Sequence, residues 1–146
     1  MTIDTTGEWW KGSEYADIPE YLRALEPGGY SVDEVVQARC RCGGTQFRLH
    51  VDRDNELAQT ICVACDREAF VSDSGDHWHE ASPELRNCPC GQPVCEIGLG
   101  LCIREASWVR WMSVGVRCVA CGVLVSPLDW KSDAQRDDAS AMRIAG

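Results

Sequence analysis

Ten cysteines carry most of the chemical information in this sequence of 146 residues. Eight of them form four pairs in which one or two residues separate the two cysteines. Two such pairs, brought together by a hairpin, supply the four soft donors that a tetrahedral zinc ion requires. The spacing therefore predicts two structural zinc sites, the first formed by Cys40, Cys42, Cys62 and Cys65, and the second by Cys88, Cys90, Cys118 and Cys121.

Disulfide bonds, redox chemistry and metal-free burial are the other roles open to these cysteines. Residues 1–11 contain no basic segment followed by an apolar stretch, so we expect no secretory signal and a cytoplasmic, reducing location. A redox-active Cys-x-x-Cys belongs at the start of a helix after a βαβ unit, a pattern that this sequence lacks. Burial of eight thiols without a metal explains the repeated spacing less well than ligation does.

The cysteine motifs occur twice, which indicates an internal duplication. RCRCG at residues 39–43 matches NCPCG at residues 87–91, and CVAC occurs at both residues 62–65 and residues 118–121. The offset between the copies is 48 residues at the first motif and 56 at the second, so the second copy contains eight extra residues. An insertion divided equally between two strands of a hairpin keeps every side chain on its original face. We therefore expect a longer hairpin in the second copy.

Alternating apolar residues predict a β-hairpin between the two cysteine pairs of each copy. In the first copy Phe47, Leu49 and Val51 alternate with polar residues, and turn-forming residues follow. We expect each copy to be a three-stranded antiparallel sheet with a metal at one end, too small to be stable without that metal. The expected strands are 47–51, 57–61 and 68–71 in the first copy, and 94–103, 108–117 and 123–126 in the second, with a turn at 104–107.

The residues before the first cysteine pair predict a different kind of segment. Asp17 is in position to cap one short helix that ends at residues 27–29. The valines within residues 32–36 favour a strand, although residues 31–34 also fit a helix-capping box. The predicted organisation is an N-terminal arm (1–38), a first metal-binding copy (39–82), a second copy (83–131) and a flexible tail (132–146).

The cysteine motifs resemble the knuckles of the zinc-ribbon superfamily, in which two turns from adjacent hairpins hold one zinc ion. The resemblance rests on CPCG at residues 88–91 and CVACG at residues 118–122, and it covers about residues 38–130. The sequence differs from the usual pattern in the Cys-x-Cys spacing of both first pairs. It also differs in Asp66, which stands where a glycine is usual.

The overall layout is also similar to that of small bacterial proteins. This similarity rests on Trp-Lys-Gly at residues 10–12 ahead of the copies and Asp-Trp-Lys at residues 129–131 behind them. The resemblance implies a small, mainly β fold of two duplicated zinc ribbons with an N-terminal arm that contains one short helix. It implies no specific activity, because zinc ribbons occur in many kinds of protein.

Four further residues could carry chemistry. Cys95 and Cys102 are seven residues apart, so in a continuous strand they face opposite sides, and we expect both to pack as small apolar residues. A bulge between them would allow a redox pair. His77 and His79 stand among carboxylates and could bind a further metal, but a polar surface loop explains them more simply. Sites closed by four thiolates leave no open position, and no nucleophile is paired with a base, so we expect no enzyme.

The acidic composition argues against general binding to nucleic acid or to an anionic membrane. The net charge is −9, distributed as −5 over residues 1–39, −4 over residues 40–82, +1 over residues 83–131 and −1 over residues 132–146. Two zinc ions, each held by four thiolates, would bring it to −13. The longest apolar stretch, residues 94–103, contains Glu96 and is too short to cross a membrane. We therefore expect a basic protein partner.

The aromatic residues exceed what two small sheets need for their cores. Tryptophan and tyrosine are frequent in interface hot spots, although the N-terminal arm could equally bury several of them against the sheets. Near the aromatic residues of the second copy, three arginines offer the one plausible nucleic-acid face, but cross-strand packing and solvated arginines explain them more simply. These are Arg104, Arg110 and Arg117 near Trp108 and Trp111, while the other surplus aromatics are Trp9, Trp10, Tyr15, Tyr21, Tyr30, Trp78 and Trp130.

These observations predict a non-catalytic zinc-binding module that acts as an adaptor, regulator or inhibitor of a basic protein partner. The alternative is a transcription- or RNA-associated zinc ribbon that binds nucleic acid through its second copy. A metal-dependent or thiol-based enzyme is a third hypothesis.

Overall fold

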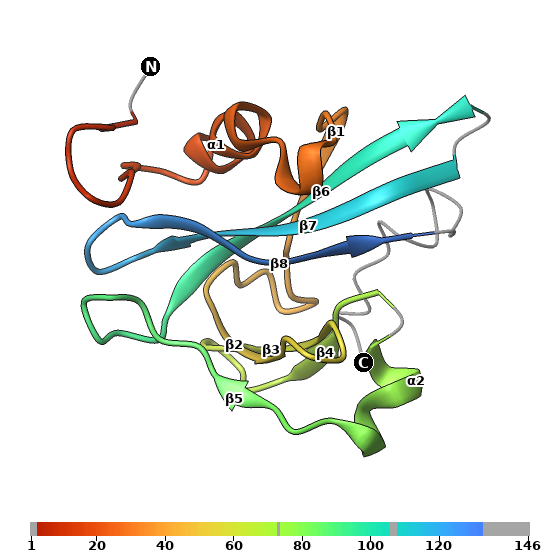
Figure 1. Cartoon of the computed structure of the whole chain (residues 1–146). Coiled ribbons are helices and arrows are strands. Elements are labelled where there is room, and N and C mark those ends of the chain that lie inside the picture. The colour runs from red at the N-terminus through yellow and green to blue at the C-terminus, as the bar shows by residue number, and fades with distance from the viewer. Residues whose placement is uncertain (1–2, 73, 106–107, 133–146) are drawn as a thin grey trace.

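The structure, a computed structural model, describes residues 3–72, 74–105 and 108–132, and it confirms a mainly β fold with one short helix near the N-terminus (Figure 1). No helix within these residues is long and apolar enough to cross a membrane. The elements are α1 (Asp17–Leu25), η1 (Pro27–Gly29), β1 (Glu34–Gln37), β2 (Phe47–Asp52), β3 (Leu57–Cys62), β4 (Glu68–Phe70), α2 (Ser74–His77), η2 (Trp78–Glu80), β5 (Glu84–Leu85), β6 (Cys95–Arg104), β7 (Trp108–Cys118) and β8 (Leu124–Lys131).

Each copy forms the three-stranded antiparallel sheet that the sequence predicts. The first copy contains β2, β3 and β4, and the second contains β6, β7 and β8. Strands β6 and β7 have 10 and 11 residues, whereas β2 and β3 have six each, so the second hairpin is the longer one. The expected turn at 104–107 and the expected flexible tail fall partly outside the described residues.

The two copies join at the first strand of each. Phe47 of β2 lies opposite Cys95 of β6 in an antiparallel pair, which gives one sheet in the order β4-β3-β2-β6-β7-β8. Phe47 and Cys95 occupy equivalent positions in the duplicated sequence, so the copies meet there through a local two-fold relation. A single hydrophobic cluster includes Phe47 and Leu49 together with Ile97 and Val116. The copies therefore share a core, which the duplication alone does not predict.

The N-terminal arm packs on the second copy. Strand β1 pairs with β6, and α1 contacts β6 and β7, so both lie on one side of the longer hairpin (Figure 1). The strand expected within residues 32–36 is confirmed, with the second copy as its partner. The expected helix cap is wrong: Ala16 occupies the N-cap position of α1. The Asp17 carboxylate instead accepts the backbone N–H groups of Ser13, at 2.7 Å, and Glu14, at 3.2 Å, in the preceding turn.

Two cross-strand glycines provide the surface on which α1 lies. Gly98 of β6 faces Gly115 of β7, and a Cβ atom at Gly115 would lie 2.9 Å from Leu22 Cδ1 and 3.0 Å from Ile18 Cγ2. Both α1 side chains are fully buried. A glycine inside a strand commonly marks such a close approach. The absence of side chains at this pair lets the helix reach the sheet.

We expect Gly115→Val to lower the free energy of unfolding by about 1–3 kcal/mol, because the added atoms overlap α1 in a packed interface. Chemical denaturation monitored by circular dichroism measures the change. The control is Gly7→Ala, where the nearest atom to a new Cβ is 3.6 Å away. Equal midpoints for the Gly115 variant and the parent protein would show that α1 is not held in this position.

Candidate metal centres

The first metal centre is formed by the two turns that flank the β2–β3 hairpin. The Cys40 and Cys65 sulfurs are 3.5 Å apart, and the Cys42 and Cys62 sulfurs are 3.6 Å apart. All four sulfurs lie within 4.8 Å of one another. Cys40 and Cys62 are buried, while Cys42 and Cys65 face solvent. The four sulfurs thus form a compact group between the core and the surface.

The second metal centre repeats this arrangement at one end of the longer hairpin. The Cys88 and Cys121 sulfurs are 3.4 Å apart, the Cys90 and Cys118 sulfurs are 3.7 Å apart, and again all four lie within 4.8 Å. Sulfurs at the corners of a tetrahedron around zinc, with Zn–S bonds of about 2.3 Å, are separated by about 3.8 Å. The two sulfur–sulfur distances given for each group lie within a few tenths of an ångström of this value, and the other distances are at most 4.8 Å. Each group could therefore hold one metal ion.

The same backbone hydrogen bonds shape the first turn of both centres. The Gly43 N–H donates to the Cys40 carbonyl at 2.8 Å, and the Gly91 N–H donates to the Cys88 carbonyl at 2.7 Å. Both glycines have a positive φ, 93° and 91°, which a left-handed turn requires and glycine adopts without strain. The two centres are thus duplicated in their supporting turns as well as in their ligands.

Backbone donors favour ionisation of one thiol in each centre. In the first centre, the Arg67 backbone N–H lowers the pKa of the Cys65 thiol to about 7. In the second, burial acts to raise the pKa of Cys118, but the backbone N–H groups of Cys121 and Ala120, together with hydrogen bonds from the Cys88 and Cys90 sulfurs, lower the pKa to about 7. A thiol that ionises near neutral pH is a ready metal ligand.

Other thiols in the same groups resist ionisation. Burial raises the pKa of the Cys88 thiol to about 12. The Gly44 N–H acts to lower the pKa of Cys42, but hydrogen bonds with the neighbouring sulfurs together raise it to about 12. Four thiolates this close repel one another unless a cation lies between them. The electrostatics of both groups therefore suit a bound divalent cation.

The residue that follows the last cysteine of each centre, Asp66 in the first and Gly122 in the second, differs between the copies. Gly122 has a φ of 84° and Asp66 has a φ of 62°. The Gly122 N–H donates to the Cys118 carbonyl and the Asp66 N–H donates to the Cys62 carbonyl, each at 2.8 Å. The departure from the zinc-ribbon pattern at Asp66 thus leaves the turn unchanged. A Cβ atom at Gly122 would lie 2.5 Å from the Gly12 carbonyl oxygen, whereas Asp66, at the equivalent turn of the first copy, is exposed. Gly122 is required by the arm as well as by the turn.

We expect opposite effects from exchanging these residue types. Asp66→Gly should raise the free energy of unfolding by about 0.5 kcal/mol, because glycine relieves the left-handed backbone. Gly122→Ala should lower it by about 1–3 kcal/mol, because the new methyl group meets the Gly12 carbonyl. Thermal and denaturant unfolding of both variants test this. Equal and opposite changes in the two variants would show that backbone strain alone matters at these positions, and a loss of stability in Asp66→Gly would contradict the strain assigned to Asp66.

The remaining cysteines and histidines lie outside the two centres. The register from Cys95 to Cys102 is continuous through Gly98 and Gly100, so the two cysteines face opposite sides of β6, and both are free. Burial raises the pKa of the Cys95 thiol to about 12, as expected of a core residue. His77 and His79 join no group of metal ligands among the described residues.

Of the three arginines that could form a nucleic-acid face, Arg117 is engaged in contacts within the protein. Arg117 Nη1 forms an ion pair with Glu96 at 2.6 Å, and the guanidinium also donates to the carbonyls of Gly12 and Ser13, each at 2.9 Å. Arg117 therefore fastens the arm to the second copy. The sequence did not indicate this role of Arg117. It also did not indicate the contact of Gly12 with the turn at Gly122.

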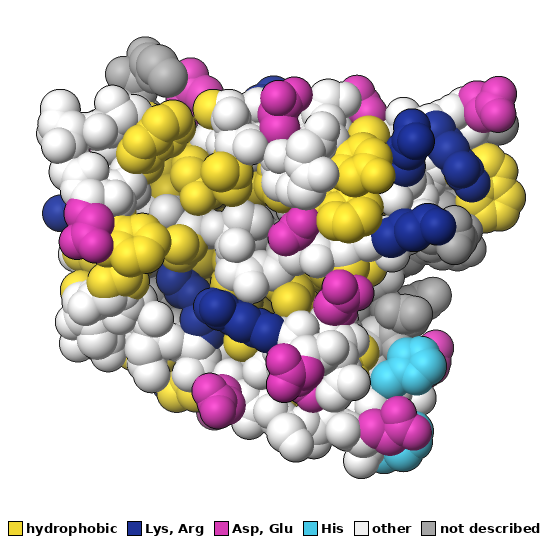
Figure 2. Space-filling model, in the orientation of Figure 1, with side chains coloured by type: hydrophobic (Ala, Val, Ile, Leu, Met, Phe, Trp, Pro, Cys, Tyr) yellow, Lys and Arg dark blue, Asp and Glu magenta, His cyan; other side chains and the backbone are white. Residues whose placement is uncertain are grey.

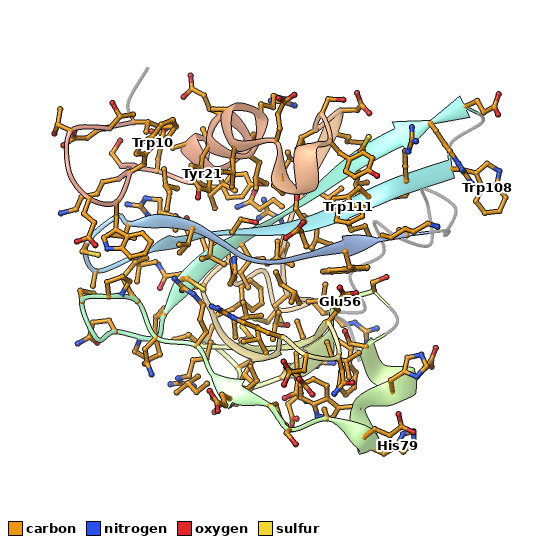
Figure 3. The ribbon with its side chains drawn as sticks, viewed as in Figure 1. Trp10, Tyr21, Glu56, His79, Trp108 and Trp111 are labelled. Carbon is orange, nitrogen blue, oxygen red and sulfur yellow. The ribbon has the colours of Figure 1, made fainter. Side chains whose placement is uncertain are left out.

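The aromatic residues of that face are also partly engaged. The Trp111 ring stacks on Tyr30, with centroids 4.7 Å apart, and its Nε1–H donates to Asp129 at 2.9 Å. The Arg110 guanidinium lies 5.4 Å from the Tyr30 ring centroid. Trp108 is 36% exposed at the far end of the β6–β7 hairpin (Figure 3). These contacts hold residues 27–30 against the sheet.

No protein-family model, curated protein or solved structure matches this chain. What the fold and the sites define is a small, mainly β protein with a repeated organisation and two four-cysteine groups suited to metal ions.

Proposed function

We propose that this protein is a non-catalytic module that holds two structural zinc ions and binds a basic protein partner in a reducing compartment. The observation that carries the proposal is the pair of closed groups, each with four sulfurs within 4.8 Å of one another. Zinc fits a tetrahedral set of four thiolates, and such closed sites are structural, because no coordination position remains for water or substrate. This is also the reason for proposing no catalytic role.

The charge distribution supports a basic protein as the partner. The chain carries −9 from its side chains, and four thiolates around each dication bring the metal-loaded protein to −13. A field of this sign speeds the approach of a basic partner and opposes that of nucleic acid. Three arginines of the second copy could offset this negative charge locally. One of them, Arg117, is already held in an ion pair with Glu96.

The test combines two binding experiments on the metal-loaded protein. Crosslinking in the source cell, followed by mass spectrometry, should identify a basic protein, whose association rate with the purified chain falls as salt rises. Gel-shift assays with duplex DNA and single-stranded RNA at physiological salt should show no complex. Tight nucleic-acid binding that Arg104→Ala and Arg110→Ala abolish would overturn the proposal in favour of the nucleic-acid alternative. An acidic partner would overturn it as well.

A further inference from the structure

An aromatic pocket opens where residues 8–10 of the N-terminal arm meet the end of α1 and the start of β8. Its volume is 370 Å³, within the usual range for ligand sites. Figure 3 shows Trp10 beside Tyr21 in this region, and Figure 2 shows hydrophobic side chains gathered on the same part of the surface. The lining includes Glu8, Trp9, Trp10, Tyr21, Leu25 and Leu124.

Residues 4–11 of the arm form a closed loop that carries Trp9. Asp4 and Lys11 exchange two backbone hydrogen bonds, at 2.7 and 2.9 Å, and thus close the base of the loop. The Asp4 carboxylate also accepts the Thr6 N–H at 2.9 Å and the Thr6 hydroxyl at 2.6 Å. Trp9 is nevertheless 40% exposed. The loop is held by its own hydrogen bonds rather than by burial of this tryptophan.

The inner wall of the pocket is more rigid. The Trp10 ring meets the Tyr21 ring edge to face, with centroids 6.0 Å apart, and the Trp10 carbonyl accepts the Leu124 N–H at 2.8 Å. Leu25 is 46% exposed at the rim. Two partly open apolar side chains beside a fixed aromatic wall form a surface that a ligand can cover with little rearrangement.

We propose that this pocket binds an arginine or lysine side chain, flanked by an apolar residue, on the basic protein partner. The inference rests on the proposed function and assigns its contact surface. The faces of tryptophan and tyrosine attract a cation, and the Glu8 carboxylate in the lining adds an opposite charge. The aliphatic stem of the cationic residue and its apolar neighbour would contact Leu25 and Leu124.

The charge around the pocket distinguishes it from the other exposed aromatic site. Residues 1–39, which include the arm and α1, carry −5. Trp108 lies opposite Arg104 in the β6–β7 register, in a copy whose residues 83–131 carry +1. Of the exposed tryptophans among the described residues, Trp9 is thus the one with an acidic setting.

The second metal centre supports the pocket. The Gly12 N–H donates to the Gly122 carbonyl at 2.8 Å, and Lys11 forms a β-bridge with Val123. Gly122 follows Cys121 directly, so the turn that presents this ligand also anchors the loop carrying Trp9. Damage to this contact should therefore reach the pocket even when both metal ions remain bound.

Isothermal titration calorimetry with a matched pair of peptides tests the pocket. The probe is a short amidated peptide of alternating arginine and leucine, and the comparison peptide replaces arginine by citrulline, which has the same shape without the charge. The metal-loaded protein should bind the arginine peptide at least tenfold more tightly. Trp9→Ala should weaken that binding about tenfold, and Glu8→Gln about threefold.

Three variants keep this test specific. Trp108→Ala removes another exposed tryptophan, and Asp54→Asn removes an exposed acidic charge of the first copy, so both should bind the peptide within about twofold of the parent protein. Gly122→Ala should weaken binding as Trp9→Ala does, while elemental analysis still finds two metal ions. Because Trp9 is exposed and Trp9→Ala leaves the charge unchanged, a loss in this variant reports on the pocket itself.

Equal affinity in Trp9→Ala and the parent protein would overturn the pocket assignment, as would equal affinity for the arginine and citrulline peptides. These results leave the proposed function standing if a basic partner is still found by crosslinking. Conversely, peptide binding that depends on Trp9, together with a crosslinked partner that is acidic, would support the pocket and overturn the proposed function. The two failures are therefore distinguishable.

Discussion

Cys62→Ser is expected to remove one metal ion per chain and to abolish the cooperative unfolding transition of the first copy. Zinc binding to four thiolates contributes about 10–16 kcal/mol in isolated zinc-finger peptides, which equals or exceeds the total stability of most domains. Strands β2 and β3 have six residues each and β4 has three, so this copy depends on its metal centre and on the core that it shares with the second copy. Elemental analysis and circular dichroism during a denaturant titration measure both effects.

Cys118→Ser provides a comparison within the same chain. It should also remove one metal ion, but the loss of structure should be smaller. Cys40 and Cys62 belong to the large cluster shared by both copies, whereas Cys88 and Cys118 belong to a small separate cluster with Val123. The longer β6–β7 hairpin is in addition covered by α1. We therefore expect a folded protein with one metal ion and a lower midpoint.

The control for both variants is Cys95→Ser, which replaces a buried cysteine outside the centres. It should retain two zinc ions and cost on the order of 1–3 kcal/mol from packing and hydroxyl burial. Loss of a metal ion in Cys95→Ser would mean that the ligands are assigned wrongly. Fewer than one zinc in the parent protein, or iron in its place, would contradict the zinc assignment, and a strong chelator that leaves the spectrum unchanged would contradict the structural role.

The grouping of the cysteines could be predicted because ligand geometry is encoded locally. Two residues at most separate the members of a pair, and the turn between them is fixed by backbone hydrogen bonds such as that from Gly43 to the Cys40 carbonyl. The hairpin lengths could be predicted for a similar reason, since an even insertion preserves the alternation of buried and exposed residues. Neither inference required knowledge of tertiary contacts.

The association of the copies could not be predicted from these local patterns. It depends on the pairing of Phe47 with Cys95 across β2 and β6, which are not neighbours in the sequence. The partner of β1 was equally undetermined, because its valines indicate a strand without indicating which edge it joins. The sequence left Arg117 open to a nucleic-acid face, to cross-strand packing or to solvent, and it did not indicate that the carbonyls of Gly12 and Ser13 hold its side chain. One local signal was available: Gly98 and Gly115 inside predicted strands indicate a close approach.

Phe47→Ala is expected to lower the free energy of unfolding by about 3–5 kcal/mol and to destabilise both copies together. Phe47 is fully buried, it begins β2, and it pairs with Cys62 on one side and Cys95 on the other. Removing the ring would leave a cavity at the point where the two copies join in one sheet over their common core. Because the core is continuous, the second copy should lose stability although its own strands are unaltered.

Phe70→Ala is the matched control, because Phe70 is half-buried and packs edge to face against Trp78, away from the junction. It should cost less than Phe47→Ala and leave the second copy unaffected. Hydrogen exchange of amides in β3 and in β7 reports the two copies separately. If the copies share one core, Phe47→Ala should accelerate exchange in β7 as well as in β3. Acceleration confined to β3 would show instead that the copies fold independently and that the Phe47–Cys95 pair contributes little to stability.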